Sequence, residues 1–544
     1  MKKLSFFTLL LLSFSLSSQK STPKIIVGIV IDQMCYDYLY RFQNNFSENG
    51  FKKLIRKGSH LKNMHYNYIP TYTGPGHASI YTGATPKVHG IIANSWIEES
   101  SKSIVNCVGD RSVVGIESSI LYGKSSPHRL NTSTITDQLK NEHPKSKVIS
   151  ISIKDRGAIL PGGFKSDGSY WFDYGKGQFI TSSYYLSQMP KWVKKFNAKN
   201  NALSYAQVWK PLLAKESYSA IDSSPYEKVI NGQGTAVFPY DIKNLCGLNQ
   251  SYEPFTMSPF ANKLLTDLAI EALKKENLGK GEFTDMLCIS YSSTDIAGHL
   301  FGPDSKEIED MYYRLDLELS RLLNHLEKSF GKDEFVLFLT ADHGVATVPQ
   351  KRIDEGLSGG YVFIDRVISD LRNRSITLFG VDFILGQNNL NIYLNQEVLD
   401  SILPKVSKNL LLTQLEEELS KVKGIKTTRR GMSLRSQKKN DDKWDLLLSN
   451  GFDPNRSGDL LIVLESGYLP KSSIDAHHAQ GTSHGSGYNY DTHVPCIWYG
   501  AGIKSQEIIA PLNITDIAPT LREILNLPKT GQMTGKPIEA ILKR

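Results

Sequence analysis

Residues 286–299 read MLCISYSSTDIAGH, an apolar run of strand length that ends in a polar turn. A helical pattern follows over about 305–330, and a second apolar run, FVLFL, occupies 335–339. A strand, a helix and a strand in this order predict two parallel strands that are joined by a covering helix. The helix is indicated by apolar residues at helical spacing, namely Ile308, Met311, Tyr312, Leu315, Leu319, Leu322 and Leu326.

Further runs of strand-forming residues extend this pattern toward both ends of the chain. They occupy 25–31, 148–153 and 494–499, and each adjoins a polar or glycine-bearing turn. The alternation predicts an α/β fold with a doubly wound, mainly parallel sheet flanked by helices. Ligands of such sheets bind beyond the carboxyl ends of the strands, so the residues that follow each strand are candidates for a site.

Two long stretches interrupt the alternation. Residues 162–259 are rich in aromatic and turn residues, and residues 348–478 carry helices and strands of their own. We interpret both as cap or lid segments inserted into one scaffold, because the strands on either side would otherwise be neighbours. The prediction is one catalytic domain over 20–544, with insertions at about 162–259 and 348–478.

The N-terminus has the layout of a secretory signal peptide. Lys2 and Lys3 precede an apolar run over 4–16, and Ser17, Ser18 and Gln19 follow it. The run is shorter than the roughly 20 residues that span a bilayer. We therefore expect residues 1–19 to be removed, leaving a secreted or periplasmic protein with no stable membrane anchor.

The composition is that of a soluble globular chain, with 40% apolar and 22% charged residues among 544. The formal net charge of +8 falls by two to +6 without the leader, which does not indicate a nucleic-acid partner. The basic and aromatic segment 191–196, KWVKKF, is accordingly interpreted as a solvated helix of an insertion. We expect no nucleic-acid partner, and a monomer.

The cysteines do not form a zinc site of their own. All five are scattered singly, without the paired spacing of thiolate ligands. Cys288 and Cys496 lie in apolar strands and are predicted to be buried thiols. Any disulfide would involve the other three, which are Cys35, Cys107 and Cys246.

Polar residues that can bind a metal follow or precede the predicted strands. Each has an ordinary explanation as a helix cap, a turn or a loop residue, but together they number three aspartates and three histidines. Such nitrogen and oxygen ligands suit zinc. Two tetrahedral ions fit this number if each keeps room for a substrate or a nucleophile. The six residues are Asp32, Asp295, His299, Asp342, His343 and His484.

Thr73 is the candidate nucleophile. It precedes Pro75 in the segment TYTGPGHA over 71–78, where a helix is predicted to begin, so backbone N–H groups there can receive an anion. The alternative is that Thr73 only caps that helix. Coordination to zinc would lower the pKa of its hydroxyl and make attack on phosphorus feasible.

Nine segments occur in a characteristic order. This set resembles the alkaline phosphatase superfamily, and specifically the phosphate-irrepressible, broad-specificity bacterial alkaline phosphatases. The resemblance extends over nearly the whole mature chain. The segments are IDQ (31–33), PTYTGPGH (70–77), HG (89–90) with Asn94, KDRGA (154–158), STDIAGH (293–299), TADHG (340–344), RSGD (456–459), TSHG (482–485) and TDIAPTL (515–521).

The resemblance implies a role for each candidate residue and two Zn²⁺ ions per chain. Asp295, His299 and His484 would hold one zinc, and Asp32, Asp342, His343 and the Thr73 oxygen would hold the other. Asn94, Lys154 and Arg156 would bind the phosphoryl oxygens. The charge of the substrate agrees with this, because a phosphate monoester is a dianion that a lysine and an arginine can help to neutralise.

Other histidines are assigned no catalytic role. His77, His89 and His493 lie near the motifs but are expected to pack or to hydrogen-bond to site residues. His477 and His478 form a loop pair that we interpret as exposed.

The implied activity is hydrolysis of phosphate monoesters by an alkaline phosphatase, through a covalent phosphothreonine. A sulfatase would need cysteine or serine where Thr73 stands, in a segment Cys/Ser-x-Pro-x-Arg that this chain lacks. A phosphodiesterase or nucleotide pyrophosphatase of the same superfamily is the main alternative. A phosphate-binding protein without turnover is a third, which Thr73 and the full ligand set disfavour.

Overall fold

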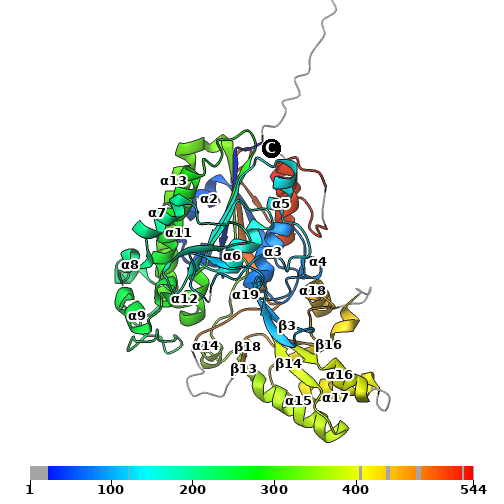
Figure 1. The fold of residues 1–544 in the computed structure, drawn as a ribbon. Coiled ribbons are helices and arrows are strands. Elements are labelled where there is room, and N and C mark those ends of the chain that lie inside the picture. Colours follow the sequence, from blue (N-terminus) through cyan, green and yellow to red (C-terminus); the bar gives the residue numbers. More distant parts are fainter. Residues whose placement is uncertain are drawn as a thin grey trace, which may run out of the picture.

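The computed structural model describes residues 22–120, 122–402, 407–435, 442–472, 480–529 and 532–542. Its largest feature is a central sheet (Figure 1). From one edge to the other, its strands are β20 (Gln506–Ile508), β2 (Ser59–His65), β19 (His493–Gly500), β12 (Phe335–Thr340), β1 (Ile25–Ile31), β11 (Asp285–Tyr291), β6 (Val148–Ser152), β7 (Gly168–Asp173), β8 (Gln178–Ser182) and β5 (Gly115–Ile116), with β21 (Leu512–Asn513) also paired to β2.

The sheet is mainly parallel, as predicted. Strands β12, β1, β11, β6 and β7 form a parallel set, while β19 and β8 run antiparallel to their neighbours. Every residue of β1, β11, β12 and β6 is buried, in keeping with their largely apolar sequences. Ile31 pairs with Tyr291, and Val30 pairs with Thr340. The carboxyl ends of these three strands therefore meet at one edge.

Helices cover both faces of the sheet. The predicted helix over about 305–330 is α13 (Lys306–Phe330), and the Ser305 hydroxyl caps it by accepting a hydrogen bond from the Ile308 N–H. Figure 1 shows α13 and α11 (Pro259–Lys275) on one side, with α3 (Thr73–Thr82) and α5 (Ile135–Glu142) on the other. The fold class inferred from the sequence is confirmed.

The stretch 162–259 contributes to the central sheet and adds short elements beside it. Strands β7 and β8 extend the sheet, and α7 (Lys191–Lys199) follows them. Val193 and Phe196 of α7 are buried, whereas Lys191 and Lys194 are exposed, so the basic segment is one side of an amphipathic helix. The remaining helices here are α8 (Ala202–Tyr205), α9 (Ile242–Asn249) and α10 (Glu253–Thr256).

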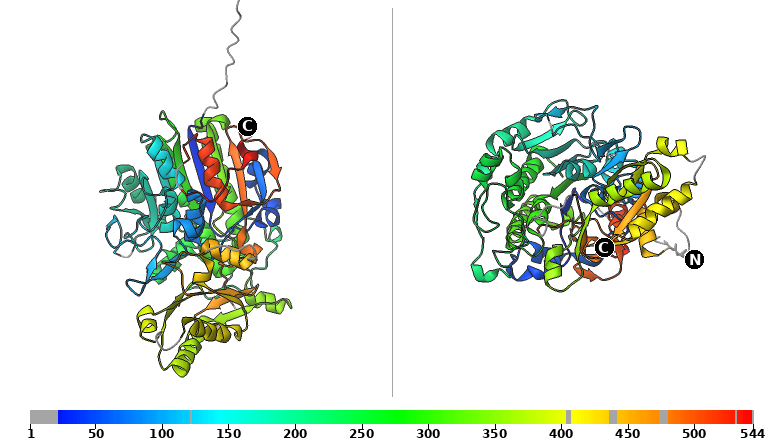
Figure 2. Two further views of the ribbon diagram at one scale, coloured as in Figure 1. Left: turned by 90° about the vertical axis from the view of Figure 1, so that its right-hand side faces the viewer. Right: turned by 90° about the horizontal axis from the view of Figure 1, so that it is seen from below.

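The stretch 348–478 contains a second sheet with its own apolar core, formed by residues such as Phe383, Leu411 and Leu415. We call residues 364–464 the accessory unit; Figure 2 shows it at one end of the molecule. Its antiparallel strands, in spatial order, are β14 (Ile384–Asn388), β15 (Asn391–Leu394), β17 (Leu460–Leu464) and β16 (Ile425–Arg430), and its helices are α15 (Ile364–Phe379), α16 (Gln396–Ile402), α17 (Lys408–Ser420) and α18 (Lys443–Gly451).

All five cysteines are free and buried, so none of them is in a disulfide. Within the described part of the chain, no helix is both long enough and apolar enough to cross a membrane. The predicted leader 1–19 and the His477-His478 pair lie outside the described residues.

Candidate active site

The predicted ligands gather where the central strands end. Asp32 follows β1, Asp295 lies in the first turn of α12 (Ser293–Phe301) after β11, and Asp342 follows β12. All three aspartates are at least 98% buried as residues. Thr73 begins α3 and is also buried. Loops and helix starts next to parallel strands thus bring together residues that are far apart in the sequence.

The first cluster consists of Asp295, His299 and His484. Both histidine Nε2 atoms face Asp295 Oδ1, at 3.3 Å from His299 and 3.5 Å from His484. The Nδ1 atoms lie 2.9 Å from the Thr482 carbonyl oxygen and 2.8 Å from the Thr71 carbonyl oxygen, respectively. An imidazole that donates its Nδ1 proton to a carbonyl offers the lone pair of Nε2 to a metal.

The second cluster is centred on His343. Its Nε2 lies 3.6 Å from both Asp32 Oδ1 and Asp342 Oδ2, and 3.4 Å from Thr73 Oγ1. Its Nδ1 lies 2.9 Å from the Gly344 carbonyl oxygen. Burial lowers the pKa of His343 well below its usual range, and so does the nearby His484. The neutral ring with Nε2 free is the form that binds a metal.

The two clusters adjoin one another. The rings of His343 and His484 stack with their centroids 3.5 Å apart, and His343 Nε2 lies 4.0 Å from Asp295 Oδ1. Potential ligand atoms of Asp32, Asp295 and His343 all lie within 4.8 Å of one another, as do those of Asp295, His299 and His484. Asp295 therefore borders both groups.

The buried carboxylates fit the metal ions that the sequence implies. Asp32 Oδ1 and Asp342 Oδ2 are buried, and neither accepts a hydrogen bond from the described residues. Burial raises the pKa of Asp342 well above its usual range, and the neighbouring Asp32 carboxylate raises it further. Buried acidic groups of this density need cations to remain ionised. Three aspartates and three histidines form a donor set that suits zinc.

Lys154 reaches the candidate nucleophile. Its Nζ lies 2.8 Å from Asp32 Oδ2, pairs with Asp295 Oδ2, and lies 3.5 Å from Thr73 Oγ1. Burial alone would lower the pKa of Lys154, but Asp295 and Asp32 outweigh it and raise the pKa above its usual value. A charged ammonium group is thus held beside the Thr73 hydroxyl.

Asn94 and Arg156 have free donor groups. Asn94 Oδ1 accepts a hydrogen bond of 2.7 Å from the Gly74 N–H, which leaves the amide N–H groups of Asn94 to donate to an anion. Arg156 has Nη1 3.7 Å from Asp155 Oδ1, and its buried Nε has no hydrogen-bond partner in the described part of the chain. Both side chains can therefore supply hydrogen bonds to phosphoryl oxygens.

Gln33 is a site residue whose role the sequence did not reveal. Its backbone N–H donates to Asp342 Oδ1 at 3.1 Å, and its side-chain Nε2 donates to Asp295 Oδ1 at 2.7 Å. One residue, through its backbone N–H and its side chain, therefore links ligands of the two clusters. Gln33 has a φ of 65°, and a Cβ at Gly298 would lie 1.8 Å from Gln33 Oε1. The position of Gln33 directly after Asp32 indicates that it lies near the site. The sequence does not indicate which way its side chain points.

The other histidines near the motifs make hydrogen bonds to neighbouring residues, as expected. His77 Nδ1 lies 2.9 Å from the Thr73 carbonyl oxygen, and its Nε2 lies 2.8 Å from Ser290 Oγ. His89 Nε2 lies 3.0 Å from Ser79 Oγ, and His493 Nε2 lies 2.9 Å from the Lys62 carbonyl oxygen.

Known proteins resemble this chain over nearly its whole length. A protein from Myroides odoratus named calcium-transporting ATPase is 37% identical over 97% of this chain and 96% of its own. Alkaline phosphatase PhoV of Synechococcus elongatus is 37% identical over 96% of this chain and 93% of its own. Alkaline phosphatase PafA of Elizabethkingia meningoseptica is 36% identical over 98% of both chains.

The same relationship holds for structures and for the family as a whole. A crystal structure of wild-type alkaline phosphatase PafA superimposes with a TM-score of 0.90 at 34% identity, covering 96% of this chain and 99% of that one. The model of the family described as type I phosphodiesterase / nucleotide pyrophosphatase matches residues 26–487. The chain therefore belongs to this family of the alkaline phosphatase superfamily, and it is an alkaline phosphatase, a hydrolase of phosphate monoesters.

Proposed function

We propose that the enzyme is a two-zinc phosphatase that forms a covalent phosphothreonine at Thr73. The observation that supports this most directly is the setting of Thr73 Oγ1, which lies 3.4 Å from His343 Nε2 and 3.5 Å from Lys154 Nζ at the start of a helix. A hydroxyl in this position faces the candidate metal ligands and has an ammonium group beside it. Both features favour the alkoxide that attacks phosphorus.

In the proposed reaction, Thr73 Oγ1 forms a bond to phosphorus while the bond to the leaving-group oxygen breaks. Water then attacks the phosphothreonine and releases inorganic phosphate. Asn94, Lys154 and Arg156 donate hydrogen bonds to the nonbridging oxygens in both steps. When bound, zinc at Asp295, His299 and His484 and at Asp32, Asp342, His343 and Thr73 would supply Lewis-acid stabilisation of the oxygens that gain charge.

The phosphodiesterase alternative has one observation in its favour, namely the description of the family that the chain matches. Lys154 favours the monoesterase. A monoester carries one more negative charge than a diester, and a buried ammonium beside the nucleophile stabilises that extra charge.

The test compares three substrates that share one chromogenic leaving group: an aryl phosphate, a methyl aryl phosphate and an aryl sulfate. We expect the aryl phosphate to be hydrolysed fastest, a chelator to abolish the activity and zinc to restore it. Elemental analysis of the active enzyme should find about two zinc ions per chain. Faster turnover of the diester, or full activity without bound transition metal, would overturn the proposal.

Export of the enzyme is part of the same proposal. It rests on the basic, apolar and small-residue regions of residues 1–19. N-terminal sequencing of the enzyme recovered from the extracytoplasmic fraction should find a start near residue 20.

A further inference from the structure

The accessory unit touches the phosphate-binding part of the site through one hairpin tip. This tip is the turn between β14 and β15, and it lies against the start of β3 (Ser95–Glu98) (Figure 1). Asn389 Nδ2 donates a hydrogen bond of 2.7 Å to the Ser95 carbonyl oxygen. The Ser95 hydroxyl in turn donates to Asn388 Oδ1 at 3.1 Å. Ser95 directly follows Asn94, although nearly 300 residues separate it from the hairpin.

The hairpin tip has a backbone conformation that its residues adopt only when other contacts hold it. Asn389 has a φ of 51° and Leu390 has a φ of 62°. The left-handed region is tolerated by asparagine but is unusual for leucine. Inside the accessory unit, Asn391 Nδ2 donates to the Asn389 carbonyl oxygen at 3.1 Å, and the Gly458 N–H donates to Asn391 Oδ1 at 2.9 Å. Strain that is held in this way is a reason to look for a function.

The contacts continue from Ser95 to the candidate nucleophile. Asn94 Oδ1 accepts the hydrogen bond from the Gly74 N–H, and Gly74 directly follows Thr73. The backbone of Asn94 is tied on its other side, because its carbonyl oxygen accepts a 2.9 Å hydrogen bond from the Cys107 N–H. Asn94 is therefore held directly by Gly74 and Cys107, and indirectly by the hairpin of the accessory unit through its neighbour Ser95.

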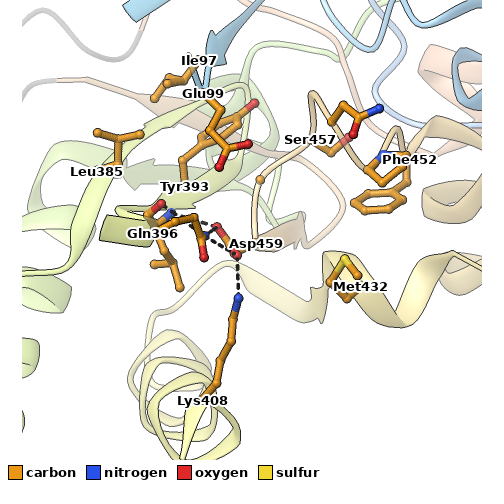
Figure 3. Close-up of a pocket in the computed structure, with 14 residues that line it drawn as sticks. Ile97, Glu99, Leu385, Tyr393, Gln396, Lys408, Met432, Phe452, Ser457 and Asp459 are labelled. Carbon is orange, nitrogen blue, oxygen red and sulfur yellow. Dashed lines mark hydrogen bonds and ion pairs between the residues drawn. The ribbon is translucent and has the colours of Figure 1, made fainter. Parts of the chain in front are cut away.

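Near this hairpin tip, a pocket interrupts the packing between β3 and the accessory unit. Its volume is about 300 Å³. Figure 3 shows Ile97, Leu385 and Gln396 on one side of this pocket, with Ser457, Phe452 and Met432 on the other. The hydrogen bonds at the hairpin tip therefore act together with the packing that remains around the pocket, where Ile97 shares an apolar cluster with Tyr393 and Leu385.

We propose that Asn389 is a positioning residue, which holds Ser95 so that the amide group of Asn94 points at the substrate phosphate. The inference rests on the proposed function, in which Asn94 binds a phosphoryl oxygen. The accessory unit then has a part in phosphate binding, although none of its residues is a candidate metal ligand or nucleophile.

The first experiment replaces Asn389 by glycine. Asn389→Gly keeps the left-handed turn accessible and removes the side chain whose Nδ2 donates to the Ser95 carbonyl oxygen and to Asn388 Oδ1. Losing the hydrogen bond to Ser95 should lower kcat/KM for an aryl phosphate, and weaken binding of inorganic phosphate measured by calorimetry, by about three- to tenfold. Leu390→Gly is the matched control, because it alters the same turn without touching Ser95; it should leave both quantities unchanged, although it loses packing against the core of the accessory unit. Both variants should retain the zinc content of the parent.

A double-mutant cycle with Asn94→Ala separates positioning from a general structural effect. If Asn389 acts through Asn94, Asn389→Gly will cause no further loss in the Asn94→Ala background. An equal loss in both backgrounds, or no loss in the parent, would overturn the inference while leaving the proposed function intact. If Asn94→Ala itself changes neither turnover nor phosphate binding, the role of Asn94 in the proposed function fails, and the positioning role fails with it.

Discussion

The central sheet and the accessory unit differ in what their strands deliver. Strands β1, β11 and β12 are buried along their whole length, and each delivers an acidic residue to the site where it ends. In the accessory unit, β15 and β17 are also buried, but β16 is at least partly exposed at every residue, and the candidate ligands all lie elsewhere. The difference indicates that chemistry resides at the carboxyl edge of the parallel sheet, while the antiparallel unit acts through its contacts with that edge.

The largest loss of activity is expected from Thr73→Ala, at the carboxyl edge of the central sheet. Without the hydroxyl no phosphothreonine can form, so kcat/KM for an aryl phosphate should fall by about 10⁴-fold or more. Thr73→Ser keeps a hydroxyl in place and should retain a good part of the activity. Mass spectrometry of acid-quenched enzyme should find phosphate on Thr73 in the parent. Phosphate found only on another residue would refute the assignment.

The next largest effect is expected from the double variant Lys154→Ala, Arg156→Ala. Charge-assisted hydrogen bonds contribute about 1.5–3 kcal/mol each, so monoester turnover should fall by roughly 10²- to 10⁴-fold. The matched methyl aryl diester should lose less, because it has one negative charge fewer. The ratio of the two kcat/KM values measures this directly, with metal analysis as the control. An equal loss for both substrates would show that these two cations do not determine the preference for monoesters.

The sequence predicts the residues at the carboxyl edge of the central sheet much better than the contacts between the accessory unit and the rest of the protein. Apolar runs such as residues 335–339 can be recognised as buried strands because the signal, a short run of apolar residues, lies within the run itself. Once the strands are parallel, the polar residues that follow them must meet at one edge of the sheet. The partners of Gln33 and Asn389 could not be predicted in this way. Each residue has a left-handed backbone conformation that sets the direction of its side chain, and each donates to an acceptor more than 250 residues away. No pattern in the neighbouring sequence indicates either the direction or the acceptor.

Arg456→Ala, at the contact between the accessory unit and the rest of the protein, should affect activity less but should clearly lower stability. Arg456 Nη1 donates to the carbonyl oxygens of Gly90 and Arg129 at 2.6 and 2.7 Å, and its guanidinium lies over the Trp96 ring. Removing it leaves two partly buried acceptors without this donor, which should destabilise the protein by about 2 kcal/mol or more.

The measurement for Arg456→Ala is thermal unfolding together with limited proteolysis. We expect a lower melting temperature and faster cleavage within the accessory unit, with a loss of kcat/KM well below that of Thr73→Ala. Arg456→Lys serves as the matched control, because it keeps the charge but cannot reproduce the planar set of donors. If Arg456→Ala reduces activity as strongly as Thr73→Ala, the separation between catalytic edge and supporting unit is wrong.

The smallest effect on activity is expected from a buried acid of the main body that takes no part in the site. Glu227 is 1% exposed, and neither of its carboxylate oxygens has a hydrogen-bond partner among the described residues. Burial raises the pKa of Glu227 far above its usual range, with further contributions from Glu307 and Asp222. Burial also raises the pKa of Glu307. The folded protein therefore holds protons that the unfolded chain has already released.

The sign of the pH dependence follows from these protons. Below about pH 4.5 both states are protonated at Glu227, and the carboxyl group does not penalise folding. As the pH rises above 4.5, the unfolded chain ionises first, so the free energy of unfolding falls until the folded pKa is passed. Glu227→Gln removes this linkage and should raise the melting temperature at pH 8 by about 2 °C or more, with the gain shrinking toward zero near pH 4.5. Glu216→Gln, at an exposed position nearby in the sequence, should shift the melting temperature little at either pH. A gain of equal size at both pH values would mean that packing, and not the proton on Glu227, sets its effect on stability.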